Sequence, residues 1–455
     1  MPDPPNPEGA LATSRTPGKG LGGEMLRGWW RSWYGKEEFR LALPEGWRLI
    51  DARMRNAPTL SDAQIQDQLR QPIGSPPLRE LARERRDACV AVDDLTRPTE
   101  TFRILPEVLD ELRAAGLRDE QLCVLVSLGT HRPLTRGDLL KKVGERVLRA
   151  VRVYNHNPYL NLARVGTTSF GTPVLINATF AAADLKIGIG LLAPHAYAGF
   201  SGGGKIVMPG LAGWESVLTN HKPASQVLSG QVGLVEGNTR RQEIDEAARI
   251  AGLKFSLNAV SNEAGETAGL FGGEVTEAWR AAARFAAEVY ATEVPMGVDI
   301  GIFNAFPKDT ELLQALNSLT PWNPEAGRRD VVRDGGTIVI ITAASEGHGW
   351  LGLNNPGAPL HRRRDRHPIY RQMLANRALY FLSPNLSQAD LLDHYPPEVK
   401  VVSDWPALRQ VLQERHGDSA TVAFFPCVPL QLGAAPDSHA FEPSGQKPVG
   451  LKADD

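Results

Sequence analysis

The sequence lacks the features that mark several specialised classes of protein. Only three cysteines occur among 455 residues, Cys89, Cys123 and Cys427, and they stand apart without a C-x-x-C or Cys/His pair. A disulfide framework or a structural zinc site is therefore not expected, and a reducing cytoplasm is predicted. No run of about eighteen apolar residues is present, so no membrane-spanning helix is predicted.

The charge balance excludes another group of partners. Fifty basic residues stand against 52 acidic ones, which gives a formal net charge of -2. Such a chain has no bulk field that would recruit nucleic acid or an anionic membrane surface. Its partners are expected to be small molecules and individual proteins.

Length and composition predict two ordered domains between two tails. A chain of 455 residues with 42% hydrophobic content accommodates two or three domains of about 150 residues each. Residues 1–24 are rich in Pro, Gly and Ser without an apolar stretch, which indicates a flexible N-terminal tail and not a signal peptide. Residues 433–455 resemble them. We expect an N-terminal α/β domain over 25–295 and a C-terminal α/β domain over 296–432.

Short apolar runs that alternate with helical patterns predict the fold class. The runs at 88–92 and 122–126 have the continuous hydrophobicity of buried parallel strands, and each is followed by a helical segment. We therefore predict two α/β domains with mainly parallel sheets that face each other across an active-site cleft. Ahead of them, residues 38–43 and 47–50 are expected to form a hairpin.

Polar residues follow both apolar runs directly. The first run ends in Asp94-Leu95-Thr96-Arg97-Pro98 and the second in Gly129-Thr130-His131-Arg132-Pro133. Functional residues gather at the carboxyl ends of parallel strands. Arg97 could hold a carboxylate through its bidentate fork, and His131 could act as a base near neutral pH. The alternatives are a surface arginine and a histidine that caps a turn.

A glycine-rich stretch between Leu191 and His221 is the strongest local signal. Ser201-Gly202-Gly203-Gly204-Lys205 could bring bare backbone amides close to an anion or a planar ring. A Walker-type phosphate loop requires Ser or Thr after its lysine, but Ile206 follows Lys205, which argues against an NTPase. The alternative is a surface loop with a solvated lysine.

These motifs together resemble the signature of the lactate racemase family, which comprises nickel-dependent racemases and epimerases of 2-hydroxy acids. The resemblance covers about residues 36–430 and includes the two loops described above. Its further parts are His195 to Lys205, Met208-Pro209-Gly210, His221, and a weaker match at Phe306-Pro307-Lys308-Asp309 with Gln314.

The resemblance implies a nickel-pincer nucleotide as cofactor. Lys205 would carry the pyridinium-3-thioamide-5-thiocarboxylic acid mononucleotide covalently. A ring carbon and two sulfurs of this nucleotide would bind Ni(II), and His221 would be the remaining metal ligand. Square-planar coordination that includes an imidazole suits Ni(II). The expected cofactor-binding residues are Asp94, Thr96, Ser201, Gly202, Gly203 and Gly204. Other proteins would have to build and attach this cofactor, so cofactor-biosynthesis proteins are implied partners.

The implied reaction inverts the C2 centre of a 2-hydroxy acid. Arg97 would bind the substrate carboxylate, and His131 and His195 would serve as general bases for the hydroxyl proton, while hydride moves reversibly to the tethered pyridinium. One alternative is a 2-hydroxyacid dehydrogenase with diffusible NAD, but no G-x-G-x-x-G opens a helix. Another is a non-catalytic nucleotide-binding protein, although both histidines are present.

The sequence departs from the family pattern in the second domain. Gln314 is the expected substrate-binding glutamine, but Asn317 stands where lactate-specific members have a lysine three residues later. Asn317 is therefore expected to meet a different substrate, and a 2-hydroxy acid other than lactate is predicted. An aromatic residue should also cover the pyridinium, with Tyr370 and Trp350 as candidates.

Overall fold

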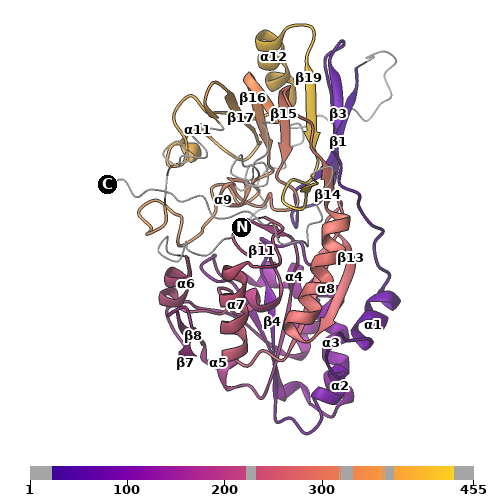
Figure 1. The fold of residues 1–455 in the computed structure, drawn as a ribbon, viewed down its shortest axis with the longest axis vertical. Coiled ribbons are helices and arrows are strands. Elements are labelled where there is room, and N and C mark those ends of the chain that lie inside the picture. Colours follow the sequence, from indigo (N-terminus) through magenta and orange to yellow (C-terminus); the bar gives the residue numbers. More distant parts are fainter. Residues whose placement is uncertain are drawn as a thin grey trace.

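The chain folds into two lobes, each built on a six-stranded sheet (Figure 1). The computed structural model describes residues 23–221, 232–316, 318, 331–361, 363 and 374–434. The predicted class, α/β with mainly parallel sheets, is confirmed. Within these described ranges no helix has both the length and the apolar character needed to cross a membrane.

The first sheet has the strand order β13-β12-β9-β4-β5-β6. All neighbouring pairs are parallel except β12 and β13, which are antiparallel. Its strands are β4 (Ala88–Asp93), β5 (Leu122–Ser127), β6 (Arg152–Asn155), β9 (Leu185–Leu191), β12 (Phe255–Ser261) and β13 (Thr267–Gly273). The two apolar runs of the sequence therefore form adjacent central strands, as predicted.

Helices cover both faces of this sheet, which explains why its strands are apolar without interruption. Val90 and Val92 of β4 pack in one hydrophobic cluster with residues of α1, α3 and α4. Cys89 and Ala91, which point the other way, pack in a second cluster with residues of α7. The helices of this lobe are α1 (Asp62–Arg70), α2 (Leu78–Leu81), α3 (Thr101–Ala114), α4 (Arg136–Ala150), α5 (Ala178–Ala182), α6 (Trp214–His221), α7 (Thr239–Ile250) and α8 (Val275–Val289).

Side-chain caps fix where several of these helices begin. Ser61 accepts a hydrogen bond from the backbone of Gln64 at the start of α1, and Thr135 accepts one from Asp138 at the start of α4. Asn238 does the same for α7. A cap of this kind satisfies an otherwise unpaired amide and contributes about 1 kcal/mol.

The second sheet is entirely parallel and has the order β18-β17-β16-β15-β19-β3. Most of its strands come from the C-terminal part of the chain. They are β15 (Val298–Asn304), β16 (Val332–Ile341), β17 (Ala378–Leu382), β18 (Lys400–Val402) and β19 (Thr421–Phe425). The helices described in this lobe are α9 (Leu312–Ala315), α11 (Gln388–Leu391) and α12 (Trp405–His416).

The N-terminal strands correct the predicted domain boundary. β3 (Arg48–Asp51) pairs with β19 in the second sheet, and β1 (Met25–Trp30) pairs with β2 (Glu37–Ala42). This hairpin packs its apolar residues against β15 and β19 of the second lobe. The expected hairpin of 38–43 with 47–50 is therefore wrong, and residues 25–51 belong with the C-terminal lobe. The cause is the open edge of β19, which β3 completes.

The remaining strands form three two-stranded sheets. They are β7 (Leu162–Thr167) with β8 (Pro173–Asn177), β10 (Pro194–His195) with β11 (Gly199–Phe200), and β14 (Ala291–Glu293) with β20 (Leu432–Ala434). The last pair lies where the chain crosses between the lobes. There Gln431 donates its side-chain amide to Ala52 O at 2.7 Å and to Thr292 Oγ1 at 3.2 Å.

Candidate active site

The loops after β4 and β5 are joined by a short hydrogen-bond network. Asp94 Oδ1 accepts the backbone amide of Thr96 at 2.9 Å and also its hydroxyl. His131 Nδ1 lies 2.6 Å from Asp94 Oδ2 and 3.4 Å from Thr96 Oγ1. The carboxyl ends of two adjacent parallel strands therefore place an imidazole directly against a buried carboxylate.

The charge state of this pair follows from its surroundings. Burial alone would raise the pKa of Asp94, but the His131 charge and hydrogen bond, with Arg97, hold the pKa of that carboxyl well below its usual range. An ionised carboxylate accepts hydrogen bonds and does not donate them. In its neutral form His131 therefore carries its proton on Nδ1, and Nε2 has the lone pair that can take a second proton.

Arg97 links this network to the second lobe. Its Nη1 donates to Thr96 Oγ1 at 2.7 Å, to Thr96 O at 3.1 Å, and to Gln314 Oε1 at 3.5 Å. Gln314 belongs to α9 and is almost fully buried. The predicted carboxylate-binding arginine and the predicted substrate-binding glutamine, 217 residues apart in sequence, are therefore in contact.

A buried lysine that sequence reasoning missed supports the Arg97 loop from below. Lys142 of α4 is fully buried, and its Nζ lies 2.7 Å from Asp93 Oδ1. The same ammonium donates to the backbone carbonyls of Arg97 and Thr99, each at 3.1 Å. Since Asp93 also accepts from Thr99 Oγ1 at 2.6 Å, the ion pair fixes the backbone that presents Arg97.

His195 is the last residue of β10, directly before the turn to β11, and differs from His131 in its hydrogen bonds. Its Nδ1 accepts the backbone amides of Tyr197 and Ala198, each at 3.2 Å. A nitrogen that accepts two N–H groups cannot hold the proton, so the neutral ring carries it on Nε2. Burial, together with the charges of Lys205, Lys308 and Arg97, lowers the pKa of His195 well below its usual value.

Close packing explains the glycines of the central loop. Gly202 and Gly203 adopt positive φ angles of 78° and 54°, which glycine tolerates best. A Cβ on Gly203 would collide with the side chains of Arg241 and Trp279. Most of the neighbouring amides already have protein acceptors, because Gly203 N donates to Asn258 Oδ1 at 2.7 Å and Ser201 N to Ala193 O at 2.8 Å. Their predicted role as a cofactor cradle stays a prediction.

Lys205, at the end of this loop, offers a free amine. Its side chain makes no hydrogen bond or ion pair within the part of the chain that the structure describes. Burial, followed by the charges of Arg97, Arg241 and Arg240, lowers the pKa of Lys205 to about 7. This shift increases the neutral fraction of the amine, which is the nucleophilic form. Lys205 is therefore suited to forming a covalent bond with an acyl group.

His221 has the hydrogen bonding of a metal-binding imidazole. It is the last residue of α6, and its Nδ1 lies 2.9 Å from Val217 O, so Nδ1 donates and Nε2 keeps its lone pair. Burial and the Lys205 charge lower the pKa of His221 to about 4. No group of three or more His, Cys, Asp or Glu residues among the described residues could hold a metal. A metal at His221 would therefore need further donors from a cofactor.

The second lobe adds two buried charged groups that were assigned no role from sequence. Lys308 follows β15, and burial together with Arg97 and Lys205 lowers its pKa well below the usual value. Burial raises the pKa of Glu311 to about 7, against the opposing charge of His131. Both are polar residues just after a strand of a parallel sheet, which is the same signal that singled out Arg97 and His131.

Three of the expected residues remain without a described role. Asn317 and Tyr370 lie outside the described residues. Trp350 is 55% exposed, and its backbone amide donates to Glu311 Oε2 at 3.2 Å. The aromatic cover of the pyridinium therefore stays a prediction.

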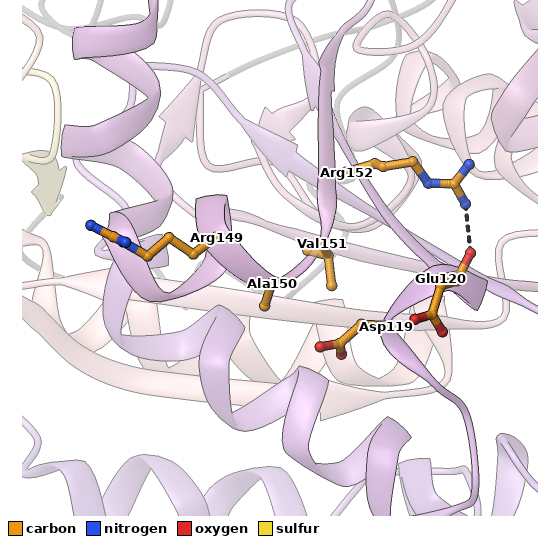
Figure 2. A pocket seen from close by; sticks show the side chains of 6 residues that line it. All are labelled: Asp119, Glu120, Arg149, Ala150, Val151 and Arg152. Atoms are coloured by element: carbon orange, nitrogen blue, oxygen red, sulfur yellow. Dashed lines mark hydrogen bonds between the residues drawn. The ribbon is translucent and has the colours of Figure 1, made fainter.

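Two surface pockets lie away from these residues. Figure 2 shows the first, which Asp119, Glu120, Arg149, Ala150, Val151 and Arg152 line, with Arg152 donating to Glu120 O at 2.7 Å. It lies at the amino ends of β5 and β6. The second is lined by residues of the N-terminal hairpin and β3. None of the candidate site residues lines either pocket, so neither pocket is the candidate active site.

Sequence comparisons match the chain to one family. A family model described as the lactate racemase N-terminal domain matches residues 34–230. Lactate racemase from Lactiplantibacillus plantarum is 31% identical over 295 residues, which are 64% of this chain and 68% of that protein. Lactate racemase from Thermoanaerobacterium thermosaccharolyticum is 29% identical over 291 residues, which are 63% of this chain and 66% of that protein.

Two solved structures share the fold. The lactate racemase apoprotein from Thermoanaerobacterium thermosaccharolyticum matches with a TM-score of 0.71 and 22% identity, over 90% of this chain and all of that one. A protein from Thermotoga maritima matches with a TM-score of 0.63 and 19% identity, over 83% of this chain and 99% of that one. The two-lobed architecture is therefore shared along nearly the whole length of both.

Proposed function

Because this chain belongs to the lactate racemase family, we propose that it is a nickel-pincer nucleotide-dependent racemase or epimerase of a 2-hydroxy acid. One observation carries the proposal. The fold brings five residues that are spread over 125 positions of the sequence into one buried region, where the charge of one shifts the pKa of another or two share a hydrogen-bond partner. They are Arg97, His131, His195, Lys205 and His221.

The residues present fit the proposed cofactor. Lys205 would hold it through its free amine, and His221 would bind nickel through Nε2, whose lone pair the Val217 carbonyl leaves available. Arg240 and Arg241 bring positive charge close to Lys205, which would favour the nucleotide phosphate. When bound, this cofactor supplies a ring that accepts hydride from C2 of the substrate and returns it.

The protein's own residues then bind the acid and move a proton. Arg97 holds the carboxylate through its guanidinium fork, with Gln314 from the second lobe beside it. His131 accepts the hydroxyl proton at Nε2, and Asp94 stabilises the imidazolium that forms through the 2.6 Å bond at Nδ1. Return of hydride to the opposite face of the planar 2-keto acid would invert the centre, and return to the same face would restore it.

His195 contributes differently in this scheme. With its proton on Nε2 it donates a hydrogen bond to a substrate oxygen. To act as a second base at Nε2 the ring would have to change tautomer and lose the two amide hydrogen bonds to Nδ1. The expectation of two general bases is therefore refined into one base and one donor.

The substrate side chain is proposed from the sequence departure at position 317. An amide at Asn317 replaces a cation, so the region beyond Gln314 suits a neutral or hydroxylated substituent. We propose a 2-hydroxy acid other than lactate as the preferred substrate, in a cytoplasmic enzyme that receives its cofactor from biosynthesis proteins.

Two measurements on one preparation test the proposal. Intact-mass spectrometry of the chain, purified from a host that makes the cofactor, should show an adduct that is absent from a Lys205→Arg variant. Chiral chromatography should then show loss of optical purity for at least one of a set of enantiopure 2-hydroxy acids, including lactate. A fully loaded chain that leaves every acid optically pure contradicts the proposed function.

A further inference from the structure

Lys308 is a buried lysine without a counter-ion among the residues that the structure describes. It lies four residues after the end of β15, its relative exposure is 9%, and its side chain makes no hydrogen bond or ion pair among the described residues. Burying an ammonium group without a partner is costly, and such groups are usually paired or are deprotonated. When Lys308 is protonated, no described residue pairs with it, so an anionic ligand would supply the partner.

The groups that face Lys308 cannot supply this partner. Arg97 and Lys205 are cations and oppose its charge, and Asp93 is the carboxylate that favours it. Asp93, however, is already engaged. Lys142 lies 2.7 Å from its Oδ1, and its Oδ2 accepts from Thr99 at 2.6 Å and from Leu191 N at 2.8 Å. The described protein therefore leaves an excess of positive charge here.

Other donors reach the same region from both lobes. Arg97 of the first lobe lies 3.5 Å from Gln314 Oε1, which is six residues beyond Lys308 on the second lobe. Lys308 and Arg97 are also two of the cations that oppose protonation of His195. Arg97 and Lys308 thus bring a guanidinium and an amine from the two lobes to one region, with Gln314 beside them, and this combination suits a small oxyanion.

We propose that Lys308 is a second carboxylate-binding residue, which the second lobe supplies and which clamps the substrate carboxylate together with Arg97. This inference rests on the proposed function and deepens it. It also changes how the departure at Asn317 is interpreted. Without a lysine at that position, the substrate carboxylate would still be bound by Arg97 and Lys308. The departure at 317 then concerns the rest of the substrate and not its acid group.

The phosphate of the nucleotide shares the same anionic chemistry. Lys308 faces His195 and Arg97, the groups assigned to the reacting end of the substrate, and this proximity favours the carboxylate. If Lys308 binds the substrate carboxylate, its removal weakens hydroxy-acid binding. If it binds the nucleotide phosphate, its removal weakens phosphate binding instead, so binding experiments distinguish the two anions.

Isothermal titration with 2-hydroxy-2-methylpropanoate tests the proposal. This acid has the carboxylate and hydroxyl of a substrate but no hydrogen on C2, so it binds without turnover. Lys308→Met should raise its dissociation constant at least tenfold, whereas Lys308→Arg should stay within about threefold of the wild type. Lys400→Met, at an exposed lysine of the same lobe, is the matched control and should change nothing.

Inorganic phosphate is the second probe, used with chain that carries no cofactor. If Lys308→Met weakens phosphate binding but leaves the hydroxy acid within threefold of the wild type, the carboxylate assignment is overturned. Unchanged binding of both probes overturns it as well. The melting temperature of unliganded Lys308→Met should equal or exceed that of the wild type, because an unpaired buried charge is removed. If this variant does not fold, Lys308→Gln takes its place.

Failure of this inference is distinguishable from failure of the proposed function. If the wild type racemises a 2-hydroxy acid and Lys308→Met leaves KM unchanged, the function stands and the clamp is wrong. If no acid is racemised but hydroxy-acid affinity still depends on Lys308, the clamp stands and the function is wrong. With both correct, Lys308→Met raises KM by at least tenfold and changes kcat less, as expected for a group that binds substrate and transition state alike.

Discussion

The two lobes contribute to the candidate active site in opposite ways. On the first lobe, Asp94, Thr96 and His131 are joined by hydrogen bonds, and Lys142 pairs with Asp93 beneath them. On the second lobe, Lys308 has no partner among the described residues, and Glu311 Oε1 is buried without a hydrogen bond. Asp94, Thr96, His131 and Lys142 of the first lobe thus have protein partners, whereas Lys308 and Glu311 Oε1 of the second lobe have none among the described residues.

This difference separates preorganisation from ligand binding. A buried polar atom without a hydrogen bond costs about 1–3 kcal/mol, and a stable fold carries few of them. Glu311 Oε1 is such an atom, and the Lys308 side chain three positions earlier makes no hydrogen bond among the described residues, so ligand contacts in this region would offset a cost that the fold carries. The hydrogen-bonded network of the first lobe instead holds its groups at fixed positions before any ligand arrives.

The largest expected effect comes from removing the base of the first lobe. His131→Ala should lower kcat by about 10²–10⁴-fold, as expected for the loss of a general base. His195→Ala should lower it less, by about tenfold to a hundredfold, which corresponds to one hydrogen bond to a charged group. Steady-state kinetics at matched cofactor loading measures both. Equal losses in the two variants would restore a mechanism with two equivalent bases.

Breaking the scaffold beneath Arg97 should cost stability. Lys142→Met leaves Asp93 buried without its cation and should lower the free energy of unfolding by about 3–5 kcal/mol. Urea denaturation measures this loss. The double variant Asp93→Asn with Lys142→Met should recover part of it, because no buried charge then remains. A loss below 1 kcal/mol in the single variant would show that the ion pair does not support the loop.

The smallest expected effect concerns the titration of Glu311 on the second lobe. Its folded-state pKa is raised to about 7, above an unfolded value of about 4.3. Its protonated form therefore stabilises the fold at low pH, and this stability is lost as the pH rises through about 7.

Glu311→Gln should remove this pH dependence while it keeps the shape of the side chain. Between about pH 6 and pH 8 the wild type should lose about 1 kcal/mol more stability than the variant. His131, Glu346 and Asp94 also face this carboxyl, and all three are present in both proteins. If the free energy of unfolding changes with pH in the same way in both proteins, the Glu311 carboxyl is more solvated than the structure shows, and the prediction is contradicted.

The central strands and the loops after them could be predicted from the sequence. The runs at 88–92 and 122–126 are apolar at every position because helices cover both faces of the sheet, and such runs indicate parallel strands directly. Once the strands are known, Arg97 and His131 fall at their carboxyl ends. Arg97 and Gln314 are each predicted to bind substrate, and the structure brings them into contact, while their roles stay predictions.

Long-range partners could not be predicted in the same way. The pattern of residues 48–51 is that of a strand, but nothing local indicates that it pairs with residues more than 370 positions later. Lys142 looks like an exposed lysine on an amphipathic helix, and only the position of Asp93 in the fold shows that it is buried. The hydrogen bonds that distinguish His195 from His131 likewise depend on backbone amides whose directions no sequence pattern fixes.

The chain crosses between the lobes near Ala52, near Thr292 and near Gln431, and these three crossings are bonded to one another. The three crossings therefore form one hydrogen-bonded connection between the lobes. Cleavage of the backbone between 293 and 298 would leave two of the three connections intact. The nicked protein should therefore elute from a gel-filtration column as one particle and separate only in denaturant.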